Sequence, residues 1–145
     1  MNTSILKILL IGLMAPAAWA ASGTPVVEVY KSPTCGCCNL WVKHLKANGF
    51  QVIAHDTNNV VAHKQRLGVP LGMGSCHTAE VGGYLVEGHV PAKDIRRLLK
   101  EQPHARGLVV PAMPMGSPGM EGDRKDAFDV LLVNRDGSTR TYARY

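Results

Sequence analysis

The feature that most constrains the fold of this chain is an apolar run followed at once by a cluster of cysteines. Residues Val26 to Tyr30 read as a buried strand, and Cys38 to Asn48 carry apolar side chains at helical spacing. Three of the four cysteines fall at the turn between these segments: Cys35, Cys37 and Cys38. Phe50 to Ala54 reads as a second strand, so the three segments predict a parallel β-α-β crossover.

The rest of the chain continues to alternate between strands and helices. Helices are predicted from Asn58 or Asn59 to Arg66 and from Pro91 to Lys100, and strands at 81–86, 130–133 and 139–142. The predicted order is β-α-β-α-β-α-β-β. With a Cys-x-x-Cys motif at the first strand-to-helix turn, this order predicts an α/β, thioredoxin-like fold with a mixed sheet. A loop rich in Met, Gly and Pro, Gly107 to Gly122, precedes the last two strands.

The first twenty residues have the features of a secretory signal peptide. Lys7 is their only charge, Ile8 to Ala18 is a short apolar run, and Ala18-Trp19-Ala20 fits a small-x-small cleavage site. The run is short for a membrane span, so we expect cleavage after Ala20, with retention as a tether left open. Residues 21–145 are then predicted to be one thioredoxin-like domain in a bacterial periplasm, without membrane contact after cleavage.

Charge and composition argue against nucleic acid as a partner. The chain has 16 Lys and Arg residues against 11 Asp and Glu, and only 6% of its residues are aromatic. The basic residues are scattered along the sequence, whereas nucleic-acid-binding domains gather them on one face or in one segment. We therefore expect no nucleic-acid binding.

The spacing of the cysteines does not suit two ordinary disulfides, which four cysteines in an exported domain would form by default. Only Cys35 and Cys38 have ordinary spacing, and a bond between the adjacent Cys37 and Cys38 would be strained. Three thiolates crowded at the start of a helix would repel one another without a shared cation, which favours a metal site. Cys76, just before the predicted third strand, would complete a four-sulfur pocket; the alternative is a small buried apolar residue.

Other side chains refine the choice of metal. His77 beside Cys76 could supply nitrogen, and His89 at a strand end could reach the site. Three methionines lie in the predicted loop: Met113, Met115 and Met120. Thioether sulfur prefers Cu(I) and is a poor zinc ligand, although each methionine could equally cap the core. Structural zinc sites usually have two separated cysteine pairs, so the compact cluster favours copper over zinc.

Four motifs, in order, resemble a family of exported metal-binding proteins that was long labelled a domain of unknown function and includes the copper-resistance protein CopG. The motifs are Lys31–Cys38, Ser75–Thr78, Glu87–Ala92 and Met113–Glu121. The resemblance implies a thioredoxin-like fold that holds a thiolate-bridged cluster of several Cu(I) ions, with a role in periplasmic copper resistance. The ligands it implies are Cys35, Cys37, Cys38 and Cys76, with His77, His89 and the loop methionines as further candidates. One departure is Ala112, where the family pattern leads us to expect glycine.

Three functions are compatible with these sequence features to different degrees. The first is copper binding for resistance, by sequestration or by Cu(I)/Cu(II) conversion, with copper ions and other periplasmic copper-handling proteins as partners. The second is a thiol-disulfide oxidoreductase using Cys35 and Cys38, which would leave Cys37 and Cys76 idle. The third, an arsenate-reductase-like activity, would want arginines near the nucleophile, where the sequence offers only lysines. Whether the protein is an enzyme stays open.

Overall fold

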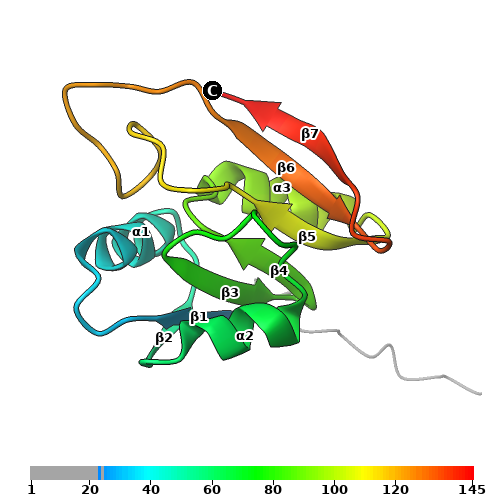
Figure 1. Ribbon diagram of the computed structural model, residues 1–145, viewed down its shortest axis with the longest axis horizontal. Coiled ribbons are helices and arrows are strands. Elements are labelled where there is room, and N and C mark those ends of the chain that lie inside the picture. Colours follow the sequence, from blue (N-terminus) through cyan, green and yellow to red (C-terminus); the bar gives the residue numbers. More distant parts are fainter. Residues whose placement is uncertain (1–22, 24) are drawn as a thin grey trace, which may run out of the picture.

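The computed structural model describes residue 23 and residues 25–145, so the predicted signal peptide, residues 1–20, lies outside the described residues. Three helices and seven strands make up the described part (Figure 1). In chain order these are β1 (Val27–Lys31), α1 (Gly36–Ala47), β2 (Val52–Asp56), α2 (Val60–Leu67), β3 (His77–Val81), β4 (Tyr84–Glu87), α3 (Ala92–Glu101), β5 (Ala105–Val109), β6 (Asp129–Asn134) and β7 (Thr139–Arg144). None of these helices is long and apolar enough to cross a membrane.

The strands form one mixed sheet in the order β2-β1-β3-β4-β5-β6-β7. The pairs β1–β2 and β4–β5 are parallel, and the other neighbours are antiparallel. The opening β1-α1-β2 unit is the predicted crossover, and the mixed α/β architecture with a mixed sheet is confirmed. Because β1 lies inside the sheet, the turn that follows it is flanked by β3.

Apolar side chains pack on both faces of the sheet. On one face Trp41 and Leu45 of α1 and Ile95 of α3 are fully buried against strand residues such as Val29. On the other face a smaller cluster is centred on Leu85 and includes residues that follow and end α2. The larger cluster fixes α1 on the sheet, and with it the cysteine turn at its first residues.

Two helix ends have ordinary caps. The Asn59 side chain accepts a hydrogen bond from the backbone N–H of Ala62 at 3.2 Å, so Asn59, one of the two residues predicted to begin this helix, caps α2. Gly49 follows α1 with a φ of +83°, where a left-handed residue ends the helix. Unlike α1, α2 has no buried residue, so polar contacts contribute much of its attachment to the sheet.

Two features of the predicted strand order are wrong. The single strand predicted at 81–86 is a hairpin of β3 and β4, turned at Gly82 and Gly83, both of which have positive φ. The predicted loop from Gly107 also begins too early, because β5 extends to Val109. Gly107 sits in that strand where a Cβ would overlap the carbonyl of Leu85, and the pairing of β5 with β6 is irregular there. The observed order therefore contains two more strands than predicted.

Candidate metal centre

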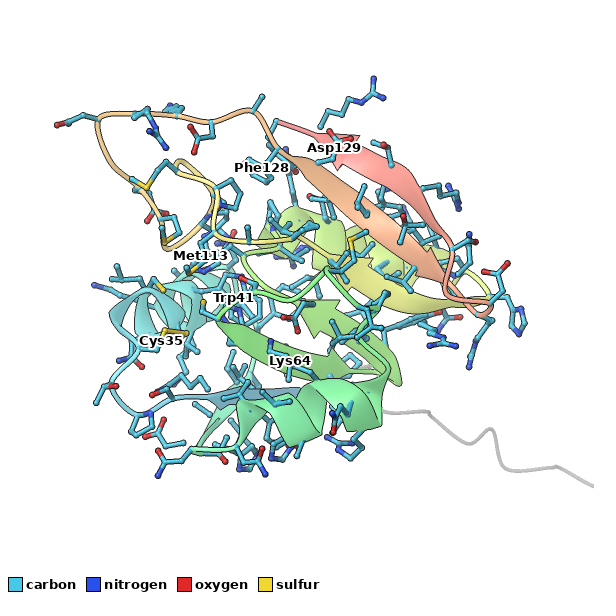
Figure 2. All side chains as sticks on the ribbon, in the orientation of Figure 1. Cys35, Trp41, Lys64, Met113, Phe128 and Asp129 are labelled. Atoms are coloured by element: carbon cyan, nitrogen blue, oxygen red, sulfur yellow. A yellow bond between two sulfur atoms is a disulfide. The ribbon has the colours of Figure 1, made fainter. Side chains whose placement is uncertain are left out.

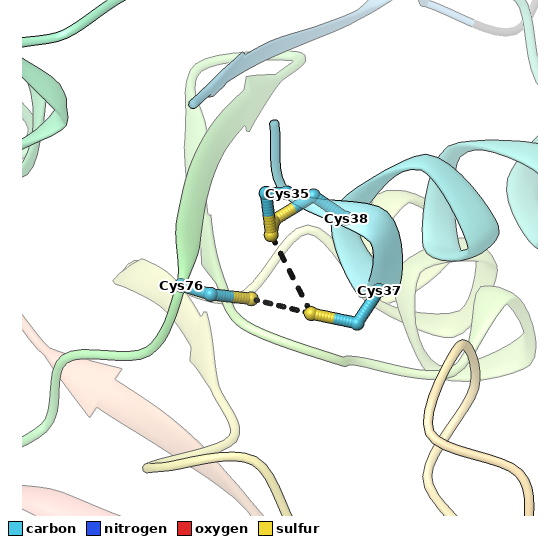
Figure 3. Close-up of side chains that lie close together, drawn as sticks. All are labelled: Cys35, Cys37, Cys38 and Cys76. Atoms are coloured by element: carbon cyan, nitrogen blue, oxygen red, sulfur yellow. Dashed lines mark hydrogen bonds between the residues drawn. A yellow bond between two sulfur atoms is a disulfide. The ribbon is translucent and has the colours of Figure 1, made fainter. Parts of the chain in front are cut away.

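The four cysteine sulfurs meet where α1 begins beside the start of β3 (Figure 3). Cys35 precedes α1 as its N-cap residue and forms a disulfide with Cys38, which confirms the pairing that the spacing predicts. Cys37 carries a free thiol, and its Sγ lies 3.5 Å from Cys35 Sγ and 3.6 Å from Cys76 Sγ. The fold therefore brings together sulfurs that are up to 41 positions apart in the chain, Cys35 to Cys76.

Cys76 also contacts two imidazoles. Its Sγ lies 3.3 Å from Nδ1 of His77 and 3.1 Å from Nε2 of His89. Two groups of possible ligand atoms thus exist, each with all its atoms within 4.8 Å of one another: the four cysteines, and Cys76 with His77 and His89. Cys76 belongs to both groups, so the two form one continuous patch of sulfur and nitrogen donors.

The orientation of His89 is fixed by the loop that follows β5. Its Nδ1 lies 2.8 Å from the carbonyl oxygen of Pro118, and a carbonyl can only accept, so Nδ1 carries the proton. In the neutral ring Nε2 then has a free lone pair directed at Cys76. Histidines that bind metal ions in other proteins commonly have the same arrangement, with the far ring nitrogen hydrogen-bonded to a backbone carbonyl.

Burial sets the protonation states of these groups. It raises the pKa of Cys76 to about 12, with the neighbouring Cys37 thiol adding to the shift. Burial likewise lowers the pKa of His77 and the pKa of His89 below that of a free imidazole. At neutral pH the Cys76 thiol is therefore protonated and both imidazoles are neutral, so a metal ion must displace the Cys76 proton in order to bind its sulfur.

Comparison with known proteins identifies the family. Two solved structures, both titled copper resistance protein CopG (Form 2 and Form 1), share 49% of their sequence with this chain, with TM-scores of 0.81 and 0.80. Each comparison covers 85% of this chain and 99% or 98% of the other. The chain belongs to the CopG family of copper resistance proteins. The family described as "Protein of unknown function, DUF411" matches residues 73–120, and no curated protein matches the sequence.

In this CopG-family chain a buried ion pair supports the segment that carries Cys76. The carboxylate of Glu87, on β4, is fully buried, and its Oε1 accepts a hydrogen bond from the backbone N–H of Ser75 at 2.6 Å. The Lys64 ammonium, from α2, pairs with the same oxygen and also donates to the backbone carbonyl of His77 at 3.2 Å. Sequence reasoning missed both residues. One signal was available in the sequence: Glu87 ends a short apolar strand, where its carboxylate would be buried. A buried carboxylate needs a partner, so a basic residue should have been sought for it.

The loop between β5 and β6 passes over the first turn of α1. A Cβ at Gly119 would lie 2.8 Å from the carbonyl oxygen of Cys37 and 2.8 Å from the backbone nitrogen of Trp41, so only glycine allows this approach. The same loop is tied to the Cys76 segment, because the Ser75 hydroxyl donates to the carbonyl of Ala112 at 2.5 Å. Ala112 has a φ of +58°, which explains why glycine is expected at this position of the family motif.

The three loop methionines occupy different environments. Met113 is 47% exposed and lines an open groove together with Pro114 and Phe128. Figure 2 shows where Met113 and Phe128 lie in the loop between β5 and β6. The Met115 methyl group lies against Gly122, and Met120 is half-buried. Copper ligation by the three methionines stays a prediction.

Proposed function

We propose that this chain binds several Cu(I) ions in a thiolate-bridged site, as part of copper resistance. The ligands are the sulfurs of Cys35, Cys37, Cys38 and Cys76 and the nitrogens of His77 and His89. The observation that carries the proposal is the position of Cys76, which belongs to a four-sulfur group and to a group with two imidazoles. We propose that this shared sulfur bridges two metal ions.

The type of donor supports Cu(I). Thiolates and imidazoles suit this ion, and thiolate sulfur readily bridges soft metals. A single tetrahedral zinc would be satisfied by four of these donors and would leave the others without a role. The Cys35–Cys38 disulfide must first be reduced, because a disulfide sulfur is not a thiolate. The site therefore accepts its full set of ions only in a reduced protein.

The biological setting of the proposal rests on the family and on the sequence. Two relatives at 49% identity are named copper resistance proteins. We place the domain in the periplasm on the predicted signal peptide, with copper ions and other periplasmic copper-handling proteins as its partners. We also propose that β1 to α3 form a thioredoxin-like unit, which the strand order β2-β1-β3-β4 supports, and that Met113, Met115 and Met120 assist copper from the loop.

A second candidate function has an observation of its own. The Cys35–Cys38 disulfide at the start of α1 is what a thiol-disulfide oxidoreductase would have in its oxidised form. The two functions respond oppositely to metal. Copper would block the attacking thiolate of an oxidoreductase, so reduction of a small disulfide substrate would be fastest in the metal-free protein. For the copper protein we expect weak disulfide reduction without metal, and a copper-loaded form that changes oxidation state without losing its ions.

The test is anaerobic titration of the fully reduced protein with Cu(I), followed by X-ray absorption. We expect more than one copper per chain, with Cu–S scattering and a short Cu–Cu distance. Cys76→Ser should lower the copper stoichiometry while circular dichroism shows that the metal-free variant is folded. If Cys76 were only a packing residue, the variant would keep its copper and lose about 1–3 kcal/mol of stability. One tightly bound zinc that copper cannot displace would refute the proposal.

A further inference from the structure

Cys37 lies between a disulfide and a second free thiol. Its Sγ is 3.5 Å from Cys35 Sγ, which is already bonded to Cys38, and 3.6 Å from the free thiol of Cys76 (Figure 3). Exchange between a thiol and a disulfide requires the attacking sulfur to contact a disulfide sulfur and leads through a new disulfide between them. Cys37 meets that requirement on one side and has a partner for a further exchange on the other.

We propose that Cys37 relays a disulfide within the metal-free protein, so that Cys37 and Cys76 form a second redox pair. In the first step the Cys37 sulfur, having lost its proton, attacks Cys35 Sγ; the Cys35–Cys38 bond breaks and Cys38 leaves as a thiolate. In the second step the deprotonated Cys76 sulfur attacks Cys37 Sγ and releases Cys35. Each leaving thiolate takes up one proton for the one lost by the attacking thiol, and no electrons enter or leave the protein.

The surroundings of Cys37 and Cys76 suit a disulfide between them. The two sulfurs face each other from α1 and from the segment before β3, and must approach from 3.6 Å to a bond length of about 2.05 Å. Both residues are half-buried, so a bulky external disulfide reaches them less easily than they reach each other. The hydrogen bond from the Ser75 N–H to Glu87 holds the backbone beside Cys76, which keeps its sulfur near Cys37.

The second pair gives the copper site an oxidised state without free thiols. A low-molecular-weight disulfide, such as oxidised glutathione, can accept two electrons from Cys37 and Cys76: their disulfide forms, and two glutathione thiols are released. With Cys35–Cys38 also closed, no cysteine sulfur is left as a thiolate for metal. The idea that this pair regulates copper binding rests on the proposed function. The exchange between the sulfurs involves the metal-free protein alone.

Disulfide mapping tests whether Cys37 and Cys76 form a redox pair. Metal-free protein with a chelator is treated with excess oxidised glutathione, quenched in acid, alkylated after unfolding and mapped by peptide mass spectrometry. We expect a monomer with two internal disulfides, Cys35–Cys38 and Cys37–Cys76. The matched variant Cys37→Ser should keep Cys35–Cys38 and leave Cys76 free or joined to glutathione. A wild-type protein in which Cys76 is free, glutathione-bound or linked to a second chain would overturn the inference.

A second variant isolates the relay step. Cys38→Ser removes the resident disulfide and leaves three thiols, which are oxidised with one equivalent of oxidised glutathione. Because Cys37 lies between the other two sulfurs, we expect it in every internal disulfide, as Cys35–Cys37 or Cys37–Cys76. A predominant Cys35–Cys76 bond would refute the relay even if the variant's overall stability differed from that of the wild type.

Copper titration separates this inference from the proposed function. We expect Cu(I) stoichiometry in the doubly oxidised wild type to fall by about tenfold or more and to recover after reduction, since the sulfur ligands are lost and regained together. If the reduced protein binds copper but Cys37–Cys76 never forms, the inference fails and the function stands. If the second disulfide forms but the reduced protein binds no copper, the function fails and the exchange chemistry stands.

Discussion

The buried ion pair behind Cys76 allows a quantitative prediction. The side chain of Glu87 is fully buried and that of Lys64 is 16% exposed, so replacing Lys64 with Met leaves a carboxylate without its counter-charge. Glu87 Oε2 has no hydrogen-bond partner among the described residues, and only the Ser75 N–H would remain on Oε1. Breaking a buried pair by removing one partner costs about 3–5 kcal/mol. Because Lys64 is not wholly buried, we expect a cost for Lys64→Met of about 3 kcal/mol, at the lower end of that range.

Removing the charge of the other partner, Glu87, should cost less stability. Glu87→Gln keeps the shape and one acceptor for the Ser75 N–H, and the partly exposed Lys64 can turn its ammonium toward water. We expect a loss of about 1–2 kcal/mol. The double variant should lose less than the sum of the two single changes, because neither charge is then left unpaired. A coupling free energy of about 1–3 kcal/mol is expected for groups in direct contact.

Urea unfolding at equilibrium measures these differences. With a slope of about 1–3 kcal/mol per molar urea, a 3 kcal/mol loss lowers the unfolding midpoint by about 1–3 M. Arg66→Met is the matched control from the same helix, since the Arg66 side chain is 49% exposed and its pair with Glu80 lies at the surface. That variant should lose no more than about 1 kcal/mol. If Lys64→Met costs no more than Arg66→Met, the argument from burial is wrong.

Three further outcomes are expected. Burial lowers the pKa of His44, whose Nε2 accepts a hydrogen bond from the first N–H of α3, so the folded state prefers the neutral ring. The free energy of unfolding should therefore fall as pH drops below the unfolded pKa of about 6.5. In thermal melts, the melting temperature of His44→Ala should change less with pH than that of the wild type. Ala112→Gly should stabilise the protein by about 1 kcal/mol in urea unfolding, because it relieves a left-handed φ. Replacing Met113, Met115 and Met120 together by Leu should speed air oxidation of copper-loaded protein, and unchanged kinetics would assign these side chains to packing.

Local patterns were enough to predict the cysteine turn. The strand before it, the helix after it and the pairing of Cys35 with Cys38 all depend on residues close together in sequence, and the structure confirms them. The cap of α2 by Asn59 is another local effect, and it too is confirmed. Where a few neighbouring residues determine the geometry, the sequence alone is a sufficient guide.

Features that depend on distant partners were not predictable in the same way. Residues His77 to Val81 do not read as a buried strand, because His77 and Thr78 are polar and become buried only when β1 and β4 pair on either side. The Gly82-Gly83 pair was a visible turn signal that should have divided the predicted strand. Lys64 and Glu87 lie 23 positions apart, and nothing in either local sequence shows that they meet.

The two groups of donors in the candidate site differ in what holds them, which indicates how the site can be dissected. The four-sulfur group depends on α1 and on the segment before β3, both fixed by the core and by the Glu87–Ser75 hydrogen bond. The group with imidazoles needs Nε2 of His89 to face Cys76, and that orientation depends on the Pro118 carbonyl in the loop after β5. Changes that displace this loop should therefore disturb copper held by nitrogen before copper held by sulfur alone. Since Cys76 belongs to both groups, its loss should affect both, and no other donor of the site has that property.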